Sequence, residues 1–299
     1  MEDEISGEAQ FSAYVYASVP LFGATLIPQL GATYDSLKSR ELEISYTSPK
    51  LGLVWVPSPD TRVRVASFHL LTPRANARTG LEPTQVAGFH QLYNDQSSAK
   101  VRTRGASIDQ RVSETVFTGL SAVDRNVLVH LTIAPTVIEY YDWQETETYG
   151  YLTWLPTKAL STSLGMKFGR YVRPEGFAGV EGFTLLESWE LPTTVRWFGR
   201  NGLSAGVTLW RVQQRGKFSD PLGAPFTFVG ASERAWLLDL SLSFRAPRHQ
   251  LVFSIEGKNL ADRHFRYQDL ATQDALLQDR ENTQIVPRRT LLARVGIRF

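Results

Sequence analysis

Apolar side chains alternate with polar or small ones through many segments of this 299-residue sequence, and this is the two-residue period of a pleated β-strand. From Trp236 to Arg245, the apolar residues other than Leu237 fall on one face, while Asp239 and Ser241 fall on the other. The same period runs through residues 160–169 and through the last nine residues. Because a helix would show a period of 3.6 residues instead, the sequence predicts an all-β protein.

Short turns alternate with long polar connections along the chain. Ser58-Pro59-Asp60 and Gly199-Arg200-Asn201-Gly202 are two of the short turns, and the long connections lie near residues 73–99, 127–146, 172–185, 214–232 and 266–286. Outer-membrane β-barrels have short turns on the periplasmic side and long loops outside, whereas a soluble sandwich has no reason to sort its loops in this way. The predicted strands, of roughly ten to fourteen residues, also match tilted strands that cross a bilayer.

We expect thirteen strands, near residues 8–20, 24–38, 44–57, 61–72, 99–112, 115–127, 146–155, 160–172, 186–198, 202–213, 233–245, 249–265 and 287–299. Bacterial single-chain barrels have an even number of strands. Either strands upstream of Met1 are missing, or Val129–Tyr141 hides a fourteenth strand. The predicted fold is therefore an antiparallel up-and-down transmembrane β-barrel of about 13 to 14 strands, part of a larger barrel. Residues 1–299 would form one N-terminally truncated domain of it.

Composition removes several other classes of function. The chain has no cysteine, so it has neither disulfides nor thiolate metal sites, and its net charge of +2 gives no field that would attract a nucleic acid. It lacks the run of about eighteen apolar residues that a transmembrane helix needs. Its acidic start, Met1 to Glu4, is unlike the basic start of a signal peptide.

No catalytic or cofactor site is recognisable in the sequence. The five histidines lack the spacing of metal ligands, and no phosphate loop, nucleophile elbow or dinucleotide motif occurs. Glu145 and Glu147 fall in a predicted loop without an oriented partner, and we expect them to be solvated. We therefore expect no enzymatic activity, no cofactor and no metal.

Charged residues recur on the polar side of the predicted strands. In a barrel they would line a water-filled lumen, and in a soluble sheet they would form a solvated face. The set is Arg196, Asp239, Arg245, Glu256, Lys258, Arg294 and Arg298. Aromatic residues near predicted strand ends suggest membrane-interface girdles, although core packing is an alternative. They are Tyr14, Tyr16, Trp55, Tyr149, Tyr151, Trp154, Trp189, Trp197, Trp210 and Trp236.

Three segments of the sequence resemble the C-terminal portion of TonB-dependent receptors. SPKLGLVWVPSPDTRVRVASF, from Ser48 to Phe68, is similar to a hairpin of that family. EGKNLADRHFRYQD, which starts at Glu256, resembles its penultimate strand, and VPRRTLLARVGIRF resembles its end. The resemblance implies an outer-membrane receptor or transporter that binds an unidentified ligand with its extracellular loops and passes the ligand through its lumen.

The same resemblance implies a location in the Gram-negative outer membrane, contact with its lipid and TonB-type energy coupling through a missing N-terminal region. The family's plug and TonB box are not recognisable here, and full barrels of this kind have about 22 strands. LEPTQVAGFHQLYND, from Leu81 to Asp95, resembles a loop of barrels that follow tetratricopeptide repeats. The alternative function is therefore a non-transporting barrel that anchors a periplasmic domain or partner. A soluble β-sandwich or propeller is a third possibility.

The C-terminus resembles the signal that the barrel-assembly machinery reads. Val295, Ile297 and Phe299 are apolar residues at every second position, and the last of them is a terminal aromatic residue. An exposed strand edge could pair with the assembly machine, and the alternating side chains would supply specificity. The alternative is that Phe299 is an ordinary packing residue.

Overall fold

The computed structural model describes residues 9–38, 43–72, 82–91, 95, 98–134, 137–175, 183–219, 227–246, 251–264 and 288–297. Every element within these ranges is a β-strand, as the alternating sequence predicts. Among the described residues, no helix is both long and apolar enough to span a bilayer.

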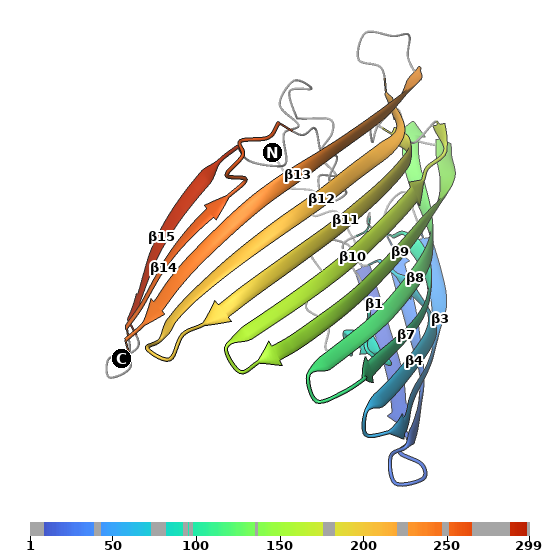
Figure 1. The fold of residues 1–299 in the computed structure, drawn as a ribbon. Coiled ribbons are helices and arrows are strands. Elements are labelled where there is room, and N and C mark those ends of the chain that lie inside the picture. The colour runs from blue at the N-terminus through green and yellow to red at the C-terminus, as the bar shows by residue number, and fades with distance from the viewer. Residues whose placement is uncertain are drawn as a thin grey trace. The chain divides into compact units, whose positions relative to one another are not determined.

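Thirteen strands form one sheet in which each strand pairs with the strand of this sheet that follows it along the chain, and neighbouring strands run in opposite directions (Figure 1). The expected antiparallel up-and-down fold is thereby confirmed. The strands are β1 (Ala9–Ser18), β2 (Leu26–Lys38), β3 (Glu43–Ser58), β4 (Thr61–Leu71), β7 (Lys100–Arg111), β8 (Val116–Ala134), β9 (Val137–Thr157), β10 (Leu160–Val172), β11 (Phe183–Phe198), β12 (Leu203–Ser219), β13 (Phe228–Arg245), β14 (Leu251–Lys258) and β15 (Thr290–Ile297). The short strands β5 (Gln85–Val86) and β6 (Phe89–His90) form a separate two-stranded hairpin.

The connection expected over residues 127–146 is wrong. In the structure β8 continues to Ala134 and β9 begins at Val137, so the Val129–Tyr141 segment extends two predicted strands and contains no fourteenth one. Its β-branched and aromatic residues favour an extended backbone even where the regular alternation fades. In the opposite direction, β14 stops at Lys258, although the sequence predicts a strand to residue 265.

The short turns lie where the sequence places them. At the turn after β11, the amide of Gly199 donates a hydrogen bond to the carbonyl of Leu203, at 2.7 Å. Gly202 has a φ of +78°, and a Cβ there would lie 2.0 Å from the carbonyl oxygen of Arg245. Only glycine fits such a position, because both the backbone angle and the contact exclude a side chain. The turn expected at Pro247-Arg248 lies outside the described residues.

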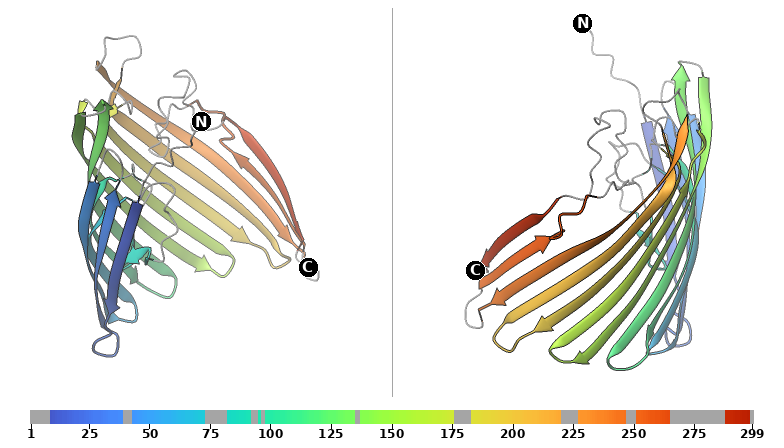
Figure 2. Two further views of the ribbon diagram at one scale, coloured as in Figure 1. Left: turned by 180° about the vertical axis from the view of Figure 1, so that it is seen from behind. Right: turned by 45° about the horizontal axis from the view of Figure 1, so that its top comes forward.

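The strands belong to two compact units. Unit 1 comprises residues 1–109 and 121–146, and unit 2 comprises residues 110–120 and 147–299. Unit 1 therefore holds β1 to β6 and most of β7, whereas β10 to β15 belong to unit 2. Figure 2 shows the strands from two further sides.

On parts of β2 and β3 in unit 1, polar side chains are buried while neighbouring apolar side chains are exposed. On β3, Lys50 is 1% exposed and Ser48 is fully buried, whereas Leu51 is 53% exposed. On β2, Thr33 and Asp35 are buried, whereas Leu30 is 56% exposed. Soluble proteins seldom bury lysine while leaving alternate leucines uncovered. This pattern is instead that of a sheet with lipid on its apolar side.

Candidate functional site

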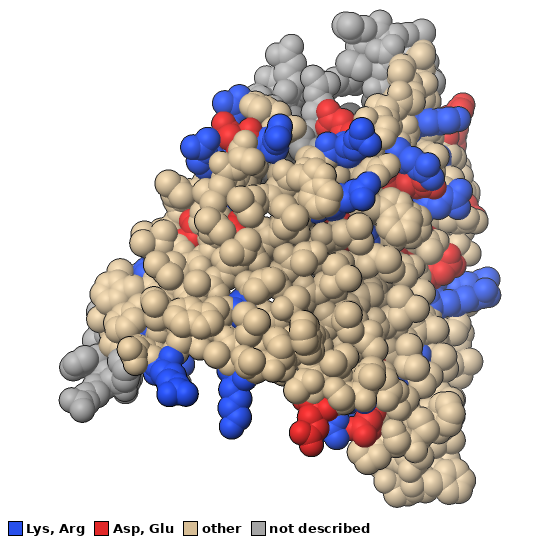
Figure 3. All heavy atoms as spheres, viewed as in Figure 1, with Lys and Arg blue, Asp and Glu red and all other residues tan. Residues whose placement is uncertain are grey.

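One face of unit 2 is apolar and exposed. The register places Val195, Val207 and Leu240 in one row across β11, β12 and β13, and Leu242 pairs with Ile255 in the next row. Both leucines and Ile255 are exposed. Figure 3 shows a broad band without charges over β10 to β13, with charged side chains gathered along both ends of the strands. A contiguous apolar surface of this kind marks a lipid or partner contact.

Tryptophans and charges bound this apolar face. On β11, Trp189 and Trp197 lie eight residues apart on the same side of the strand, which corresponds to about 27 Å along it. Immediately beyond Trp189, the carboxylate of Glu187 pairs with Arg170 at 3.4 Å and with Arg215 at 2.5 Å. An apolar band with aromatic residues at its edges and charges beyond it is the arrangement seen on transmembrane barrels.

The opposite face of unit 2 carries the charged residues that the sequence analysis selects. Arg196, Gly206, Ser241 and Glu256 form one row across four strands. The Nη1 of Arg294 lies 3.8 Å from the Oε1 of Glu256. We call this side the polar face of unit 2. Strand alternation and register place six members of the selected set on it, namely Arg196, Asp239, Arg245, Glu256, Lys258 and Arg294, and Arg298 lies outside the described residues.

Some residues of the expected aromatic girdles, Trp210 and Tyr16 among them, lie on a polar side instead. The Nε1 of Trp210 donates a hydrogen bond to the Oδ2 of Asp239, at 3.1 Å, so the ring belongs to the polar face of unit 2. In unit 1, the hydroxyl of Tyr16 donates to Glu82. The indole N–H of Trp210 and the hydroxyl of Tyr16 each find a hydrogen-bond partner on that side. Their position near a strand end in the sequence does not predict this.

The C-terminal residues expected to guide assembly are only partly described. Val295 pairs with Phe253, and both side chains are exposed on the apolar face. Ile297 pairs with Leu251 at the end of β15. Phe299 lies outside the described residues.

Asn259 organises the end of β14, within a segment that resembles the receptor family. Its φ is +46°, its Oδ1 accepts a hydrogen bond from the amide of Arg263 at 3.0 Å, and its Nδ2 donates to the carbonyl of Arg263 at 3.0 Å. Its own amide donates to the Oδ1 of Asp239, at 2.8 Å. Asparagine tolerates the left-handed backbone, and its side chain can form hydrogen bonds with the nearby backbone. The strand therefore ends at Lys258, seven residues before the predicted end at residue 265.

In unit 1, the hairpin β5–β6 is docked on the face of the sheet that carries Gln29, Thr33, Lys50 and Gly52, which we call the hairpin face. The amide of Ala87, at the tip of the hairpin, donates to the Oε1 of Gln29, at 2.7 Å. Val86 is 2% exposed as a result of this docking. This segment falls within the long connection that the sequence predicts over residues 73–99, so its docking on the sheet is not predicted.

Glycines in the strands make room for the docked hairpin. A Cβ on Gly52 would lie 2.9 Å from the side chains of Val86 and Ala87, and a Cβ on Gly105 would lie 2.5 Å from the ring of Phe89. Neither distance is sterically possible, so only glycine lets the hairpin approach this closely. The guanidinium of Arg64 lies over the ring of Phe89, at 5.9 Å from the ring centroid, and donates to Asp109 at 2.9 Å.

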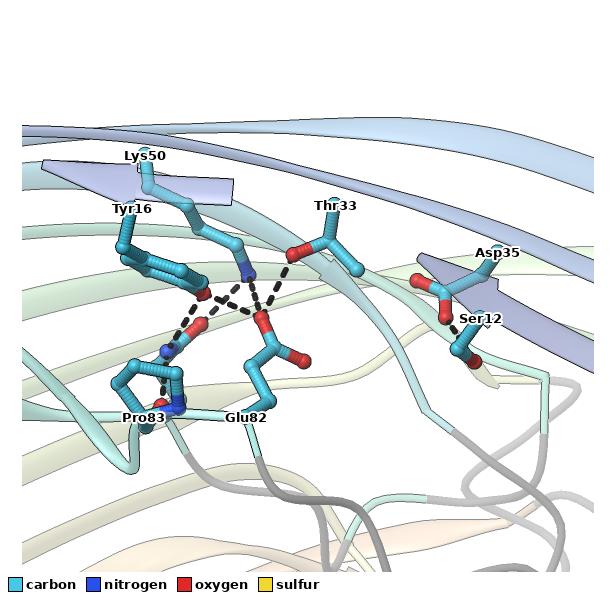
Figure 4. A network of polar contacts seen from close by, with 8 residues as sticks. Ser12, Tyr16, Thr33, Asp35, Lys50, Glu82 and Pro83 are labelled. Carbon is cyan, nitrogen blue, oxygen red and sulfur yellow. Dashed lines mark hydrogen bonds and ion pairs between the residues drawn. The ribbon is translucent and has the colours of Figure 1, made fainter. Parts of the chain in front are cut away.

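A polar network fixes both ends of the hairpin segment to three strands (Figure 4). The Oε1 of Glu82 accepts hydrogen bonds from Tyr16 and from Thr33, the latter at 2.6 Å, and lies 3.4 Å from the Nζ of Lys50. Lys50 also donates to the Oε1 of Gln91, at 2.5 Å, and Gln91 donates to Tyr16 at 3.2 Å. The ammonium of Lys50 is almost fully buried, so this network supplies the partners that a buried charge requires.

A second buried charge cluster lies on unit 1. Arg125 donates to Asp95 at 2.6 Å and also to Glu145, which is therefore a strand residue with a partner and not a solvated loop charge. Burial raises the pKa of the Asp95 carboxyl, and the neighbouring Arg125 guanidinium opposes that rise. In unit 2, Glu147 accepts a hydrogen bond from Tyr171 at 2.7 Å. The chain uses both glutamates to join structural elements.

Within the described ranges, no group of three or more histidine, aspartate or glutamate side chains is arranged to hold a metal ion. Glu82, Asp95 and Glu147 each accept a hydrogen bond from a cationic or hydroxyl side chain of their own unit.

Comparison with known proteins identifies the fold. No protein-family model and no curated protein matches the sequence. Among solved structures, the chain is similar to the ferric-catecholate import receptor Fiu from Escherichia coli K12, with 13% identity, a TM-score of 0.62 and coverage of 98% of this chain and 45% of Fiu. For a mutant of the ferric enterobactin receptor PfeA from Pseudomonas aeruginosa, the identity is 12%, the TM-score is 0.66, and the coverage is 96% and 44%.

A third similar structure is the outer-membrane transporter YddB from Escherichia coli, with 11% identity, a TM-score of 0.60 and coverage of 97% of this chain and 45% of YddB. The chain spans less than half of the length of these proteins. At such low identity the likeness concerns the fold. YddB is named as an outer-membrane transporter, which agrees with the location that the sequence predicts. The chain has the fold of the TonB-dependent receptor barrels of the Gram-negative outer membrane and spans one part of such a barrel.

Proposed function

We propose that the protein is an outer-membrane receptor barrel that binds a ligand with its long loops and passes the ligand through a lumen lined by its polar faces. The exposed apolar face of unit 2 carries this proposal, because a surface of that extent, bounded by Trp189 and Trp197, is stable against lipid tails but not against water. Arg196, Asp239 and Glu256 would then face water inside the barrel, where charged side chains are tolerated.

The matched proteins also suggest which ligands to test. Two of them are named for iron complexes, ferric catecholate and ferric enterobactin, and the third is a transporter. All three are transport receptors rather than enzymes, which supports the expectation that this chain is not an enzyme. We include lipid contact, delivery by the barrel-assembly machinery and TonB-type energy coupling in the proposal.

Uptake by whole cells tests this function. Cells that carry the gene, a deletion strain and a complemented strain would be given radiolabelled ferric enterobactin and a panel of other iron chelates under iron limitation. We expect the deletion to lower uptake of at least one chelate, complementation to restore it, and collapse of the proton-motive force to stop it. Unchanged uptake of the whole panel would contradict a transport role for iron chelates and would favour the anchoring barrel.

Location is tested separately. We expect the protein in the outer-membrane fraction, with gel migration in detergent that changes on heating. Recovery of the natural protein in buffer without detergent would contradict the membrane assignment, whatever the uptake assay gives.

A further inference from the structure

Three donors from three neighbouring strands meet at one carboxylate oxygen on the hairpin face. Tyr16 lies on β1, Thr33 on β2 and Lys50 on β3, and the register places Tyr16, Gly31 and Lys50 in a single row. The oxygen is the Oε1 of Glu82, which accepts from both hydroxyls and faces the ammonium at 3.4 Å (Figure 4). We call Tyr16, Thr33 and Lys50 the carboxylate seat.

The carboxylate seat belongs to the strands, while its occupant does not. Thr33 and Lys50 are each 1% exposed and are held by the pairing of β2 with β3. A lysine ammonium can only donate, so once buried it requires an acceptor, and a negative acceptor is favoured. Ser48 lies directly opposite Thr33 and is fully buried, and its hydroxyl has no hydrogen-bond partner among the described residues. This part of the hairpin face therefore has more hydrogen-bond donors than the strands themselves can pair.

Glu82 reaches the seat from the hairpin segment, which Gln91 closes from its other end. The amide of Gln91 donates to the carbonyl of Thr84 at 2.8 Å, and its Nε2 donates to the carbonyl of Pro83 at 2.5 Å. Because Gln91 also accepts from Lys50, both ends of the segment depend on the same ammonium. Docking of the hairpin is thus coupled to the filling of the seat by an anion.

The surroundings favour a carboxylate over a more highly charged anion. The seat holds one cationic side chain, Lys50, and Asp35 lies two residues from Thr33 on the same side of β2, where it accepts a hydrogen bond from Ser12 at 2.7 Å. A single ammonium and two hydroxyls match the one negative charge and the acceptor-only oxygens of a carboxylate. A phosphate dianion would meet a second negative charge nearby.

We propose that Tyr16, Thr33 and Lys50 form a binding seat for carboxylates, that Glu82 fills it as a ligand within the chain, and that a free carboxylate takes the same place when the Glu82 carboxylate is removed. A ligand that carries a carboxylate could then compete with the hairpin for the sheet. The inference goes beyond the proposed function and does not require transport.

Chemical rescue tests the seat on the purified chain, folded in detergent. The chain has no native cysteine, so Val86→Cys introduces a single reporter thiol at a buried position of the hairpin. We expect this variant to react slowly with a maleimide, and addition of Glu82→Ala to speed the reaction about tenfold or more because charged hydrogen bonds are lost. Acetate should then slow the reaction again, whereas chloride at equal ionic strength should not.

Control variants make each outcome decisive. In Val86→Cys with Glu82→Ala and Lys50→Met, acetate should have no effect. Glu82→Gln, which keeps the shape of the side chain and guards against misfolding of the alanine variant, should speed labelling without rescue by acetate. Equal effects of acetate and chloride, unchanged labelling in both Glu82 variants, or stronger rescue by inorganic phosphate than by acetate would each overturn the proposal. None of these readouts depends on uptake, so the proposed function is judged separately.

Discussion

The Nζ of Lys50 lies 3.4 Å from the Oε1 of Glu82, and the lysine side chain is 1% exposed. The pair joins β3 to the segment that carries the docked hairpin. Its interaction energy therefore contributes to the stability of the docked arrangement. An ammonium in this position interacts more strongly than one at a solvated surface, because water screens it less.

Replacing Lys50 with Met should lower the free energy of unfolding by about 2 kcal/mol, since hydrogen bonds to a charged group are lost. The matched control is Lys38→Met, which removes an exposed lysine that lies 3.6 Å from Glu43, and its effect should stay within about 0.5 kcal/mol. Guanidinium titrations in phospholipid vesicles measure both. Equal losses for the two variants would mean that burial of Lys50 adds nothing to the interaction.

Gly105→Ala should release the hairpin, because the new Cβ would lie 2.5 Å from the ring of Phe89. The expected cost of this overpacking is about 1 to 3 kcal/mol. Release of the hairpin should be seen as faster hydrogen exchange at the Ala87 amide, which donates to Gln29 in the docked arrangement. Gly230→Ala is the control, because its Cβ would meet nothing within 4 Å, and exchange at Ala87 should not change. Unaltered exchange in Gly105→Ala would contradict the docked arrangement.

Arg125→Met should leave Asp95 and Glu145 buried without their shared cation and should cost about 3 kcal/mol near pH 8. Burial already raises the pKa of Asp95 against the opposing effect of Arg125, so loss of the guanidinium raises that pKa further. When folding raises the pKa of a carboxyl, the folded state binds the proton more tightly than the unfolded state does. The contribution of that carboxyl to the free energy of unfolding therefore increases as the pH falls.

The loss in Arg125→Met should therefore shrink between pH 8 and pH 5, as measured by unfolding titrations at both pH values. Arg215→Met serves as the control, because that side chain is mostly exposed and its partner Glu187 keeps Arg170. A loss that grows as the pH falls would show that the sign of the Asp95 contribution is wrong.

Asn259 combines two effects that different substitutions separate. Asn259→Gly keeps the backbone free to adopt positive φ but removes both side-chain bonds to Arg263, and it should cost about 1 kcal/mol. Asn259→Ala should cost about 1 kcal/mol more, because alanine disfavours the left-handed region. Unfolding titrations compare them. If alanine proved less harmful than glycine, backbone conformation would not be what selects asparagine here.

The alternating pattern predicts the regular strands well. The strand expected over residues 160–172 is β10 with the same bounds, because Leu160, Leu164 and Phe168 alternate with small or charged residues throughout. Alternation fails where β-branched residues continue a strand past its amphipathic part, as in Val129 to Ala134 of β8. It also fails at Asn259, where local hydrogen bonds end a strand that could otherwise continue.

The docked hairpin could not be predicted from local pattern. Its contacts join Glu82 to Tyr16, which is 66 positions away, and place Phe89 against a glycine in a later strand. A glycine in a strand can have several causes, and the sequence does not distinguish Lys50 from any other charged residue on the polar face of a strand. Only three-dimensional proximity reveals that these residues act together, and the same holds for Trp210 and Asp239.

In a barrel, the apolar face of unit 2 meets lipid while its polar face meets water. Leu242 and Ser241 are neighbours on β13 that point to opposite faces, so single cysteines at these positions, labelled with a fluorophore in phospholipid vesicles, compare the two environments directly. Lipids with brominated acyl chains should quench the label at position 242, and aqueous iodide should quench the label at position 241. Quenching of both labels by iodide, with no effect of the brominated lipids on position 242, would contradict it.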